Sequence, residues 1–238
     1  MGQSYFIWKG IDCRAMDVIM TGPAPVIRPE ERVDHIEIPG RSGDVTELEG
    51  TDIYNSYIQT VSIAVNRRYN IREVYKWLRG SGYVTFSTDP ERRQQARIIG
   101  AITLNKHSYN LDWYTGEVQF YCQPLKEKLS EETQTITSSG TAVKNQGDIT
   151  ARPLFKVTTT ATTVTLTMNG KSLTIDMSGL SNQSIYVDCE TKEVTDLPRT
   201  GWMTWRTSGS WPDLPVGSYN LTGSGWSSIE VTKRERFL

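Results

Sequence analysis

Apolar residues alternate with polar or small ones in several short segments of this chain, a period of two that is typical of half-buried β-strands. In TVSIAV (residues 60–65), the apolar residues Val61, Ile63 and Val65 would share one face of a strand. Three further segments have the same pattern: YVTFS (83–87), ARIIGAITL (96–104) and EVQFYC (117–122). The sequence therefore predicts a mainly β protein.

One segment has a helical pattern instead, NIREVYKWLRGSG (residues 70–82). Its apolar residues recur at i, i+3, i+4 and i+7 and would form one stripe: Ile71, Val74, Tyr75 and Leu78. Asn70 with Glu73 resembles a capping box at the start, and Gly80 and Gly82 favour a left-handed stop at the end. The first half is therefore predicted to be an α+β domain, residues 1–125, in which one helix covers a sheet.

The composition changes after this domain. Residues 126–150 are polar and rich in Ser and Thr, which predicts a linker, with a first edge strand at its end. The rest, residues 151–238, has strand patterns only. Asn169-Gly170 within VTLTMNGKSLTI is a strong hairpin signal, and a second hairpin is predicted to turn at Thr191-Lys192. These features predict a small C-terminal β-sandwich or jelly roll.

The charge balance excludes one class of function. Lys and Arg number 26 against 27 Asp and Glu, for a net charge of −1, and neither half has a basic excess. Sequence-specific nucleic-acid binding depends on such an excess, so it is not expected. No apolar run has the length of about 18 residues that a membrane span needs, and the N-terminus has no signal-peptide core. We therefore expect synthesis and folding in a cytoplasm, with no membrane partner.

Histidine and cysteine residues do not form a recognisable catalytic or metal-binding motif. His35 and His107 are far apart and have no nucleophile motif beside them. The three cysteines, Cys13, Cys122 and Cys189, are odd in number and widely spaced, which argues against disulfides and zinc. Buried or incidental thiols are the simpler interpretation.

A glycosidase would need two carboxylates on either side of one bond. Asp188 and Glu190 alternate along one strand, with Asp176 nearby in sequence, but each fits equally a solvated residue beside a turn. No enzyme emerges, and we expect no catalytic residue, metal or cofactor.

The segment IEIPGRSGDVTE (residues 36–47) contains two glycines, Gly40 and Gly43, on either side of Arg41 and Ser42. They are too close for a Walker phosphate loop, and no Lys-Ser/Thr pair follows. The segment is therefore predicted to be a tight turn between strands, with a possible role in recognition.

Tryptophans concentrate near the C-terminus, where Trp202, Trp205, Trp211 and Trp226 fall within 25 residues. Such residues could pack in the core, fill a protein interface or stack on sugar rings. The sequence leaves these three alternatives open.

The order of the motifs resembles one known family. The first half has YFIWKGID, then IPGRSGDV, YIQTVSIAV, a helix ending in Trp77-Leu78, GYVTFSTDPERRQQARI and GEVQFYCQPLK. The second half has NQGDITARPLFKV, MNGKSLTI, IYVDCETKEV, LPVGSYNLT and SIEVTKRERF. This order is similar to that of the distal tail proteins of siphoviruses, the phages with long non-contractile tails, and the resemblance covers nearly the whole chain.

The resemblance implies a structural virion protein at the tail tip. Residues 1–125 would form a hexameric ring around a channel through which genomic DNA passes, and residues 151–238 would be a galectin-like or carbohydrate-module-like β-sandwich. The ring would join the major tail-tube protein to the tail-associated fibre or lysin protein, and would often carry receptor-binding proteins as well.

Ring contacts are expected at exposed loops and strand edges. The candidates are the turn, with Pro39, Gly40, Arg41, Gly43 and Asp44, and the basic residues before and within the helix, Arg67, Arg68 and Arg72. The alternative function is a carbohydrate-binding module that attaches to host surface glycan. In that case, or for a partner protein, the candidate contacts are Trp202, Trp205 and Trp211.

Overall fold

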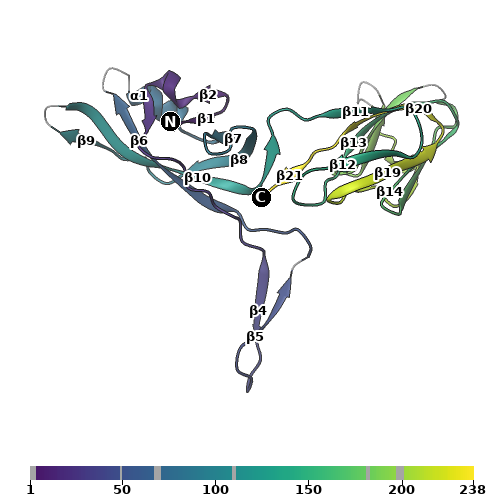
Figure 1. Ribbon diagram of the computed structural model, residues 1–238, viewed down its shortest axis with the longest axis horizontal. Coiled ribbons are helices and arrows are strands. Elements are labelled where there is room, and N and C mark those ends of the chain that lie inside the picture. Colours follow the sequence, from purple (N-terminus) through teal and green to yellow (C-terminus); the bar gives the residue numbers. More distant parts are fainter. Residues whose placement is uncertain (1–3, 49, 67–70, 109–110, 181–182, 197–200) are drawn as a thin grey trace. The chain divides into compact units, whose positions relative to one another are not determined.

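The computed structural model describes residues 4–48, 50–66, 71–108, 111–180, 183–196 and 201–238. The chain divides into two compact units: unit 1 comprises Met1–Leu129 and Leu238, and unit 2 comprises Ser130–Phe237. Both consist largely of strands, and the described residues contain one α-helix, so the mainly β prediction is confirmed (Figure 1). None of the described helical segments has the length and apolar character to cross a membrane.

Unit 1 is built on one antiparallel sheet with the strand order β2-β1-β7-β8-β10-β6-β3, in which β9 also pairs with β10. The bounds in this sheet are β1 Phe6–Trp8, β2 Ile11–Asp12, β3 Val18–Met20, β6 Tyr57–Asn66, β7 Ser81–Phe86, β8 Arg92–Ile99, β9 Leu104–Ser108 and β10 Leu111–Lys128. A short 3-10 helix, η1 (Cys13–Met16), follows β2. The expected face of β6 is confirmed, because Val61, Ile63 and Val65 are buried.

The long strand β10 holds this sheet together, because it pairs with β6, β8 and β9. One expectation beside it was wrong: residues 96–104 are not one strand. Strand β8 ends at Ile99 and β9 begins at Leu104. Between them Gly100 has φ +72°, a left-handed conformation that ends the extended run.

The helix α1 (Ile71–Trp77) lies against the sheet through a cluster of aromatic rings. The indole Nε1 of Trp8 donates a hydrogen bond to the carbonyl of Trp77 (3.1 Å), and the Nε1 of Trp77 donates one to the carbonyl of Trp8 (3.2 Å). Phe6 stacks on Trp77 at 5.6 Å, and Phe120 of β10 meets Phe6 edge-on at 5.5 Å. Helix and sheet are thus joined by packing and by two buried hydrogen bonds.

The expected apolar stripe of the helix is only partly correct. Val74 and Leu78 are buried, whereas Tyr75 is 39% exposed and Trp77 lies in the core instead. The wider indole fills the space above Phe6, and it shifts the buried face by part of a turn.

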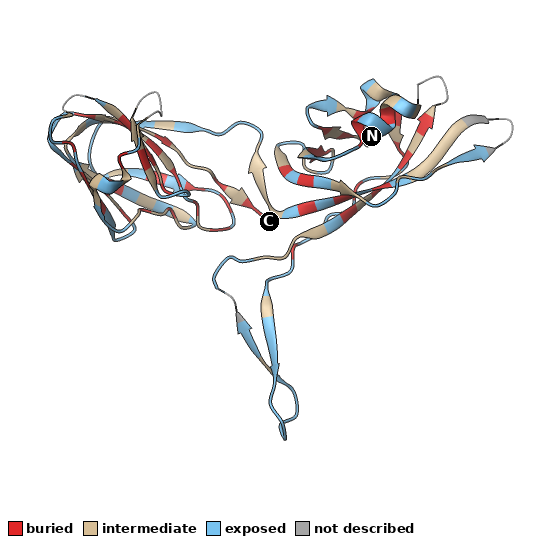
Figure 2. Cartoon of the chain, turned by 180° about the vertical axis from the view of Figure 1, so that it is seen from behind, coloured by how far each residue is buried: buried red, intermediate tan, exposed pale blue. Residues whose placement is uncertain are grey.

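Unit 2 is a sandwich of two five-stranded sheets, β11-β20-β13-β16-β17 and β12-β19-β14-β15-β18. Figure 2 shows its buried residues along the facing sides of the strands. The bounds are β11 Thr133–Ile136, β12 Thr141–Asn145, β13 Leu154–Thr159, β14 Thr163–Met168, β15 Lys171–Asp176, β16 Ser184–Asp188, β17 Glu193–Asp196, η2 Thr204–Arg206, β18 Thr207–Gly209, β19 Gly217–Ser224, β20 Trp226–Thr232 and β21 Arg236–Phe237. The predicted C-terminal β-sandwich is therefore confirmed.

The segment 126–150, expected to be a linker with a strand at its end, contains more structure than that. Strand β10 continues to Lys128, and β11 and β12 each pair with a strand of the sandwich, β20 and β19. Each contributes a single large apolar side chain to the core, Ile136 and Val143, among polar neighbours. With one large apolar residue in each strand, the sequence shows no alternation of apolar and polar residues. The polar composition of the segment therefore indicated a linker.

Turn chemistry predicted the hairpins of unit 2 more reliably. Asn169 and Gly170 have φ +50° and +72° between β14 and β15, as a two-residue hairpin turn requires. In the second hairpin Asp188 pairs with Glu193, and Lys192 in the loop has φ +56°.

Replacing Trp77 tests the contact between the helix and the sheet. Trp77→Phe keeps a ring above Phe6 but leaves the carbonyl of Trp8 without its donor. We expect a loss of about 1–2 kcal/mol in the free energy of unfolding of unit 1, measured by urea denaturation followed by circular dichroism. The exposed control Tyr75→Phe should stay within about 0.5 kcal/mol of the original protein. Equal stability of the two variants would contradict this role for the indole N–H.

Candidate functional site

A separate β-hairpin extends from unit 1, formed by β4 (Val33–Glu37) and β5 (Asp44–Leu48) (Figure 1). Its two strands pair with each other as a two-stranded sheet that is not part of the main sheet. Within β4 every residue after Val33 is exposed. We call the hairpin and its base, residues 30–55, the arm.

The glycine-containing segment lies at the tip of the arm, as the loop between β4 and β5. Gly40 and Gly43 have φ +83° and +81°, and a Cβ on either would meet no atom within 4 Å. Their backbone conformation, and not crowding, is what favours glycine. The amide of Arg41 donates to the carbonyl of Ile38 at 3.1 Å, which closes the turn. The loop surrounds a shallow hollow lined by Glu37, Ile38, Pro39, Arg41, Gly43 and Asp44.

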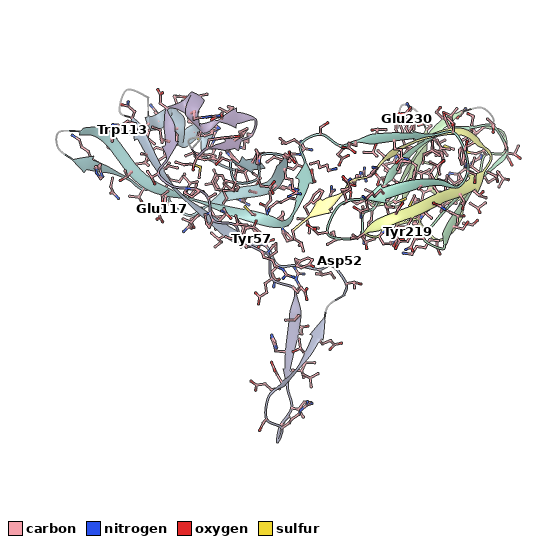
Figure 3. The ribbon with its side chains drawn as sticks, in the orientation of Figure 1. Asp52, Tyr57, Trp113, Glu117, Tyr219 and Glu230 are labelled. Carbon is pink, nitrogen blue, oxygen red and sulfur yellow. The ribbon has the colours of Figure 1, made fainter. Side chains whose placement is uncertain are left out.

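Backbone pairing continues below the two strands to the base of the arm. The amide of Arg32 donates to the carbonyl of Ile53 (3.0 Å), and that of Asn55 donates to the carbonyl of Glu30 (2.8 Å). The side chain of Arg32 also donates to Asn55 Oδ1 at 3.2 Å. Pairing therefore resumes at the base of the arm, at Glu31 and Tyr54, and Figure 3 shows Asp52 and Tyr57 where the arm meets the sheet.

The arm is strongly acidic, whereas the rest of unit 1 is basic. The sequence from 30 to 53 carries eight carboxylates (Glu30, Glu31, Asp34, Glu37, Asp44, Glu47, Glu49 and Asp52) against two arginines (Arg32 and Arg41), a net charge of −6. The remaining residues up to 129 carry 14 Lys and Arg against eight Asp and Glu, a net charge of +6. The near-neutral total thus hides two oppositely charged regions in one unit.

The strand register brings like charges face to face. Asp34 lies opposite Glu47, and Glu37 lies opposite Asp44. Like charges in directly opposed positions destabilise a ladder, by roughly 0.2–1 kcal/mol per pair. His35 Nδ1 lies 2.6 Å from Asp44 Oδ2 across the hairpin, so a protonated imidazole would offset part of this repulsion. The arm on its own therefore has an excess of negative charge that an external cationic surface would neutralise.

The other ring-interface candidates lie around α1. Arg72 is exposed on the first turn of the helix, whereas Arg67 and Arg68 lie outside the described residues.

A cavity of about 300 Å³ lies in unit 1 between the segment that precedes the arm and strands β7 and β8. Gln94 fills one wall: its Nε2 donates to Tyr57 Oη (2.9 Å), and Gln59 Nε2 donates to the carbonyl of Pro25 (2.6 Å). Burial raises the pKa of Tyr57 to about 12, so its hydroxyl stays neutral. The rim carries the cationic side chains of Arg92, Arg93 and Lys126.

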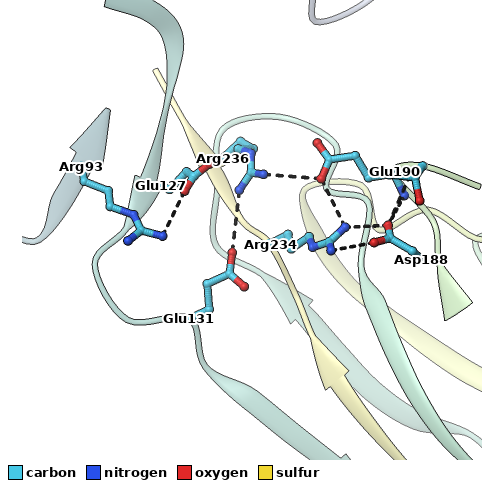
Figure 4. Close-up of polar contacts among 8 residues, drawn as sticks. Arg93, Glu127, Glu131, Asp188, Glu190, Arg234 and Arg236 are labelled. Carbon is cyan, nitrogen blue, oxygen red and sulfur yellow. Dashed lines mark hydrogen bonds and ion pairs between the residues drawn. The ribbon is translucent and has the colours of Figure 1, made fainter. Parts of the chain in front are cut away.

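The two carboxylates considered for a glycosidase are joined by one arginine (Figure 4). Arg234 donates from both terminal nitrogens to Asp188, at 2.7 and 2.8 Å, and its Nη1 also reaches Glu190 at 3.2 Å. Arg236 approaches Glu190 (3.7 Å) and Glu131 (3.9 Å). These contacts form an ion-pair network that holds the segment after β20 to the β16–β17 turn.

The charge state of Asp188 follows from this network. Burial acts to raise the pKa of its carboxyl, but the hydrogen bonds and charge of Arg234, with the amides of Thr191 and Glu190, outweigh burial and lower the pKa. A carboxylate held ionised in this way cannot serve as the general acid of a glycosidase at neutral pH.

The histidines and cysteines that the structure describes are not arranged as a catalytic or metal-binding site. All three cysteines are buried, and burial raises the pKa of each thiol, to about 12 for Cys122. His107 is exposed on β9. Across the described ranges, no group of three or more His, Cys, Asp or Glu side chains has the arrangement to hold a metal ion.

The tryptophans of unit 2 divide into two groups. Trp211 and Trp226 pack against the core of the sandwich, so Trp211 is a half-buried packing residue. Trp202 and Trp205 are 63% and 76% exposed. Sequence reasoning named Trp202, Trp205 and Trp211 together, and their burial alone separates them.

Comparison with known proteins gives one informative result. No family model matches the chain, and no curated protein matches it. Among solved structures it is similar to SPP1 Dit (gp 19.1), a siphophage distal tail protein described as a paradigm of the hub of the adsorption apparatus in phages that infect Gram-positive bacteria. The match has a TM-score of 0.79 and covers 100% of each chain at 21% identity. The resemblance inferred from the sequence is thus confirmed at the level of the fold.

Asp188→Asn tests the ion-pair network of unit 2. The variant removes the charge that Arg234 binds, and we expect it to lower the free energy of unfolding of unit 2 by about 2 kcal/mol at pH 7. Because the pKa of Asp188 is lower in the folded protein, its contribution is complete above the ordinary carboxyl pKa of about 3.9 and is lost as the pH falls below it. The loss of stability on acidification should therefore be smaller in the variant.

Chemical denaturation between pH 7 and pH 3 measures both effects. Glu132→Gln is the control, because its ion pair with Lys233 is long (4.0 Å) and Glu132 is 69% exposed. It should change the stability by less than about 0.5 kcal/mol. A variant of Asp188 with unchanged stability and pH dependence would show that the network has no stabilising role.

Proposed function

We propose that this chain is a structural protein of a siphophage tail tip, a distal tail protein that forms a hexameric ring. One observation carries the proposal: the fold matches that of SPP1 Dit over the full length of both chains. A partial match could reflect one widespread domain, whereas a match across two different units also reproduces their order. The chain would thus serve as a hub of an adsorption apparatus.

The proposal includes no catalysis. Among the groups considered for chemistry, Asp188 and Glu190 bind Arg234, and the cysteine thiols are buried. Ion pairing and packing account for these residues without a substrate.

A closed ring requires each copy to present two different, complementary surfaces, because the contact is head-to-tail. Unit 1 has such a pair of regions, the arm with a net charge of −6 and the remainder with +6. The arm of one subunit would lie against the basic surface of the next. This contact would relieve the repulsion between Asp34 and Glu47 and between Glu37 and Asp44.

The details of this contact follow from the hairpin. The outer edges of β4 and β5 are free to extend a sheet of the neighbouring subunit, and the tip loop with Pro39, Gly40, Arg41, Gly43 and Asp44 would fix the register. For the basic partner of the arm we propose Arg67, Arg68 and Arg72, of which the structure describes Arg72 as exposed. The cations around the unit 1 cavity, Arg92, Arg93 and Lys126, are not assigned to this contact, because they pair with Asp89 and Glu127 of the same unit.

The ring would join the major tail-tube protein to the tail-associated fibre or lysin protein and would carry receptor-binding proteins. Its place would be the tip of the virion tail. Genomic DNA would pass through its channel.

The mass of the purified protein tests the ring. A hexamer has six times the 26.9 kDa of the chain, about 161 kDa, and two stacked rings have twice that. Sedimentation velocity at micromolar concentration should give one of these masses. A stable monomer at that concentration would contradict the proposal.

Charge reversal on the arm tests how the ring forms. Asp34→Lys with Glu37→Lys replaces two exposed carboxylates by cations, and we expect the hexamer to weaken at least tenfold while the subunit stays folded. Because exposed charges are screened over about 3 Å at 1 M salt and about 10 Å at 0.1 M, high salt should weaken the original hexamer in the same direction.

The matched control is Glu132→Lys with Asp148→Lys, an equal charge change at exposed positions of unit 2. This control should assemble normally. If the arm variant forms hexamers as readily as the control does, the arm is not the ring contact. The proposal of a hexameric ring would be unaffected by that result.

A further inference from the structure

Segment 201–206 of unit 2 exposes two indole rings. Trp202 is 63% exposed and Trp205 is 76% exposed, although a tryptophan is usually among the most buried residues of a domain. Among the described residues of unit 2, the other large apolar side chain of similar exposure is Val216. One short segment therefore carries two exposed aromatic rings.

The backbone that carries these rings is held firmly. Between them Met203 is buried in the core, and its amide donates to the carbonyl of Val194 at 2.7 Å. Thr204 Oγ1 accepts a hydrogen bond from the amide of Val194 at 3.0 Å. Met203 anchors the segment to β17, so the backbone that carries Trp202 and Trp205 is held in a conformation that exposes both side chains.

Arg206 orients one of the rings. Its guanidinium carbon lies 4.6 Å from the centroid of the Trp205 ring. The same guanidinium donates through Nη1 to the carbonyls of Ser178 (2.8 Å) and Asp176 (3.3 Å). The cation is thus fixed by the backbone of a neighbouring turn and covers one part of the indole, which lowers the entropic cost of binding a ligand to the rest.

The size of this surface distinguishes between possible ligands. A tryptophan contributes about 150–250 Å² of contact area. Two rings supply at most about 500 Å², whereas a stable protein interface needs about 800 Å² per partner with an apolar centre. The two indoles alone therefore fall short of the apolar area of a protein interface, whereas their area matches one or two sugar rings.

The chemistry points the same way. A gluco-configured pyranose has axial C–H groups on its faces and hydroxyls around its rim. The C–H groups carry partial positive charge and match the negative face of an indole. The hydroxyls would meet exposed polar groups of the same unit; Ser178, whose carbonyl binds Arg206, is exposed.

We propose that segment 201–206 is a carbohydrate-binding site for gluco-configured polysaccharides, in which pyranose rings stack on Trp202 and Trp205. Arg206 is a positioning residue that holds Trp205. The site does not depend on the ring and would give unit 2 an adhesive role of its own.

Saturation-transfer difference NMR on the full chain tests the site, with cellohexaose and chitohexaose as probes. We expect saturation to be strongest on the axial ring protons H1, H3 and H5, because these would face the indoles. Trp202→Ala and Trp205→Ala should each weaken binding about fivefold or more, and Trp205→Phe should retain part of it. Val216→Ala, at an exposed position of the same unit, should bind as the original protein does.

Thermal unfolding should be the same for all variants, since both rings are exposed. The absence of saturation transfer to either probe at millimolar concentration would overturn the proposal. So would binding that is unchanged in the Trp202→Ala/Trp205→Ala double variant. If the probes give no signal and the double variant fails to bind another tail protein, the surface is a protein contact and the carbohydrate proposal is wrong.

Discussion

Unit 1 depends on the pairing of one long strand, β10, with β6 on one side and β8 on the other. Phe120 of β10 lies at the centre of the aromatic cluster that Trp8 and Trp77 complete. Strand β3 pairs with β6, so the chain leaves the sheet after β3 and returns to it at β6. The arm is the insertion between these two neighbouring strands, and a rigid sheet supports it from both ends.

This arrangement separates stability from recognition. Among the described residues, the core cluster of unit 1 includes none from 30–55, so the charge of these residues does not disturb the core. Two pairs of opposed carboxylates and a net charge of −6 are costs to the isolated arm. In the proposed ring these carboxylates would face the basic remainder of unit 1, whose net charge is +6. The proposed ring follows from this complementarity together with the fold.

Local chemistry predicted much of the fold. The alternation at Val61, Ile63 and Val65 identified β6, and Asn169-Gly170 identified its hairpin, because both signals depend on near neighbours alone. Burial that depends on distant residues was harder to predict. Trp77, and not Tyr75, lies in the core because it contacts Trp8 and Phe6. The spacing of apolar residues within the helix cannot predict a contact with residues so distant in sequence.

The candidate site shows the same division. The spacing of the tip glycines predicted a turn, but it did not predict that β4 and β5 form a sheet of their own, apart from the main sheet. Once the arm is treated as a separate element, its net charge of −6 becomes apparent, whereas the net charge of the whole chain is only −1. Similarly, composition grouped four tryptophans, and only packing separated Trp202 and Trp205, which are exposed, from Trp211 and Trp226.

Negative-stain electron microscopy of the purified protein tests the proposed ring most directly. We expect particles with six-fold symmetry around a central channel, with one peripheral lobe per subunit. Uniform single particles of one subunit, or a closed assembly with a different symmetry, would contradict the proposed ring.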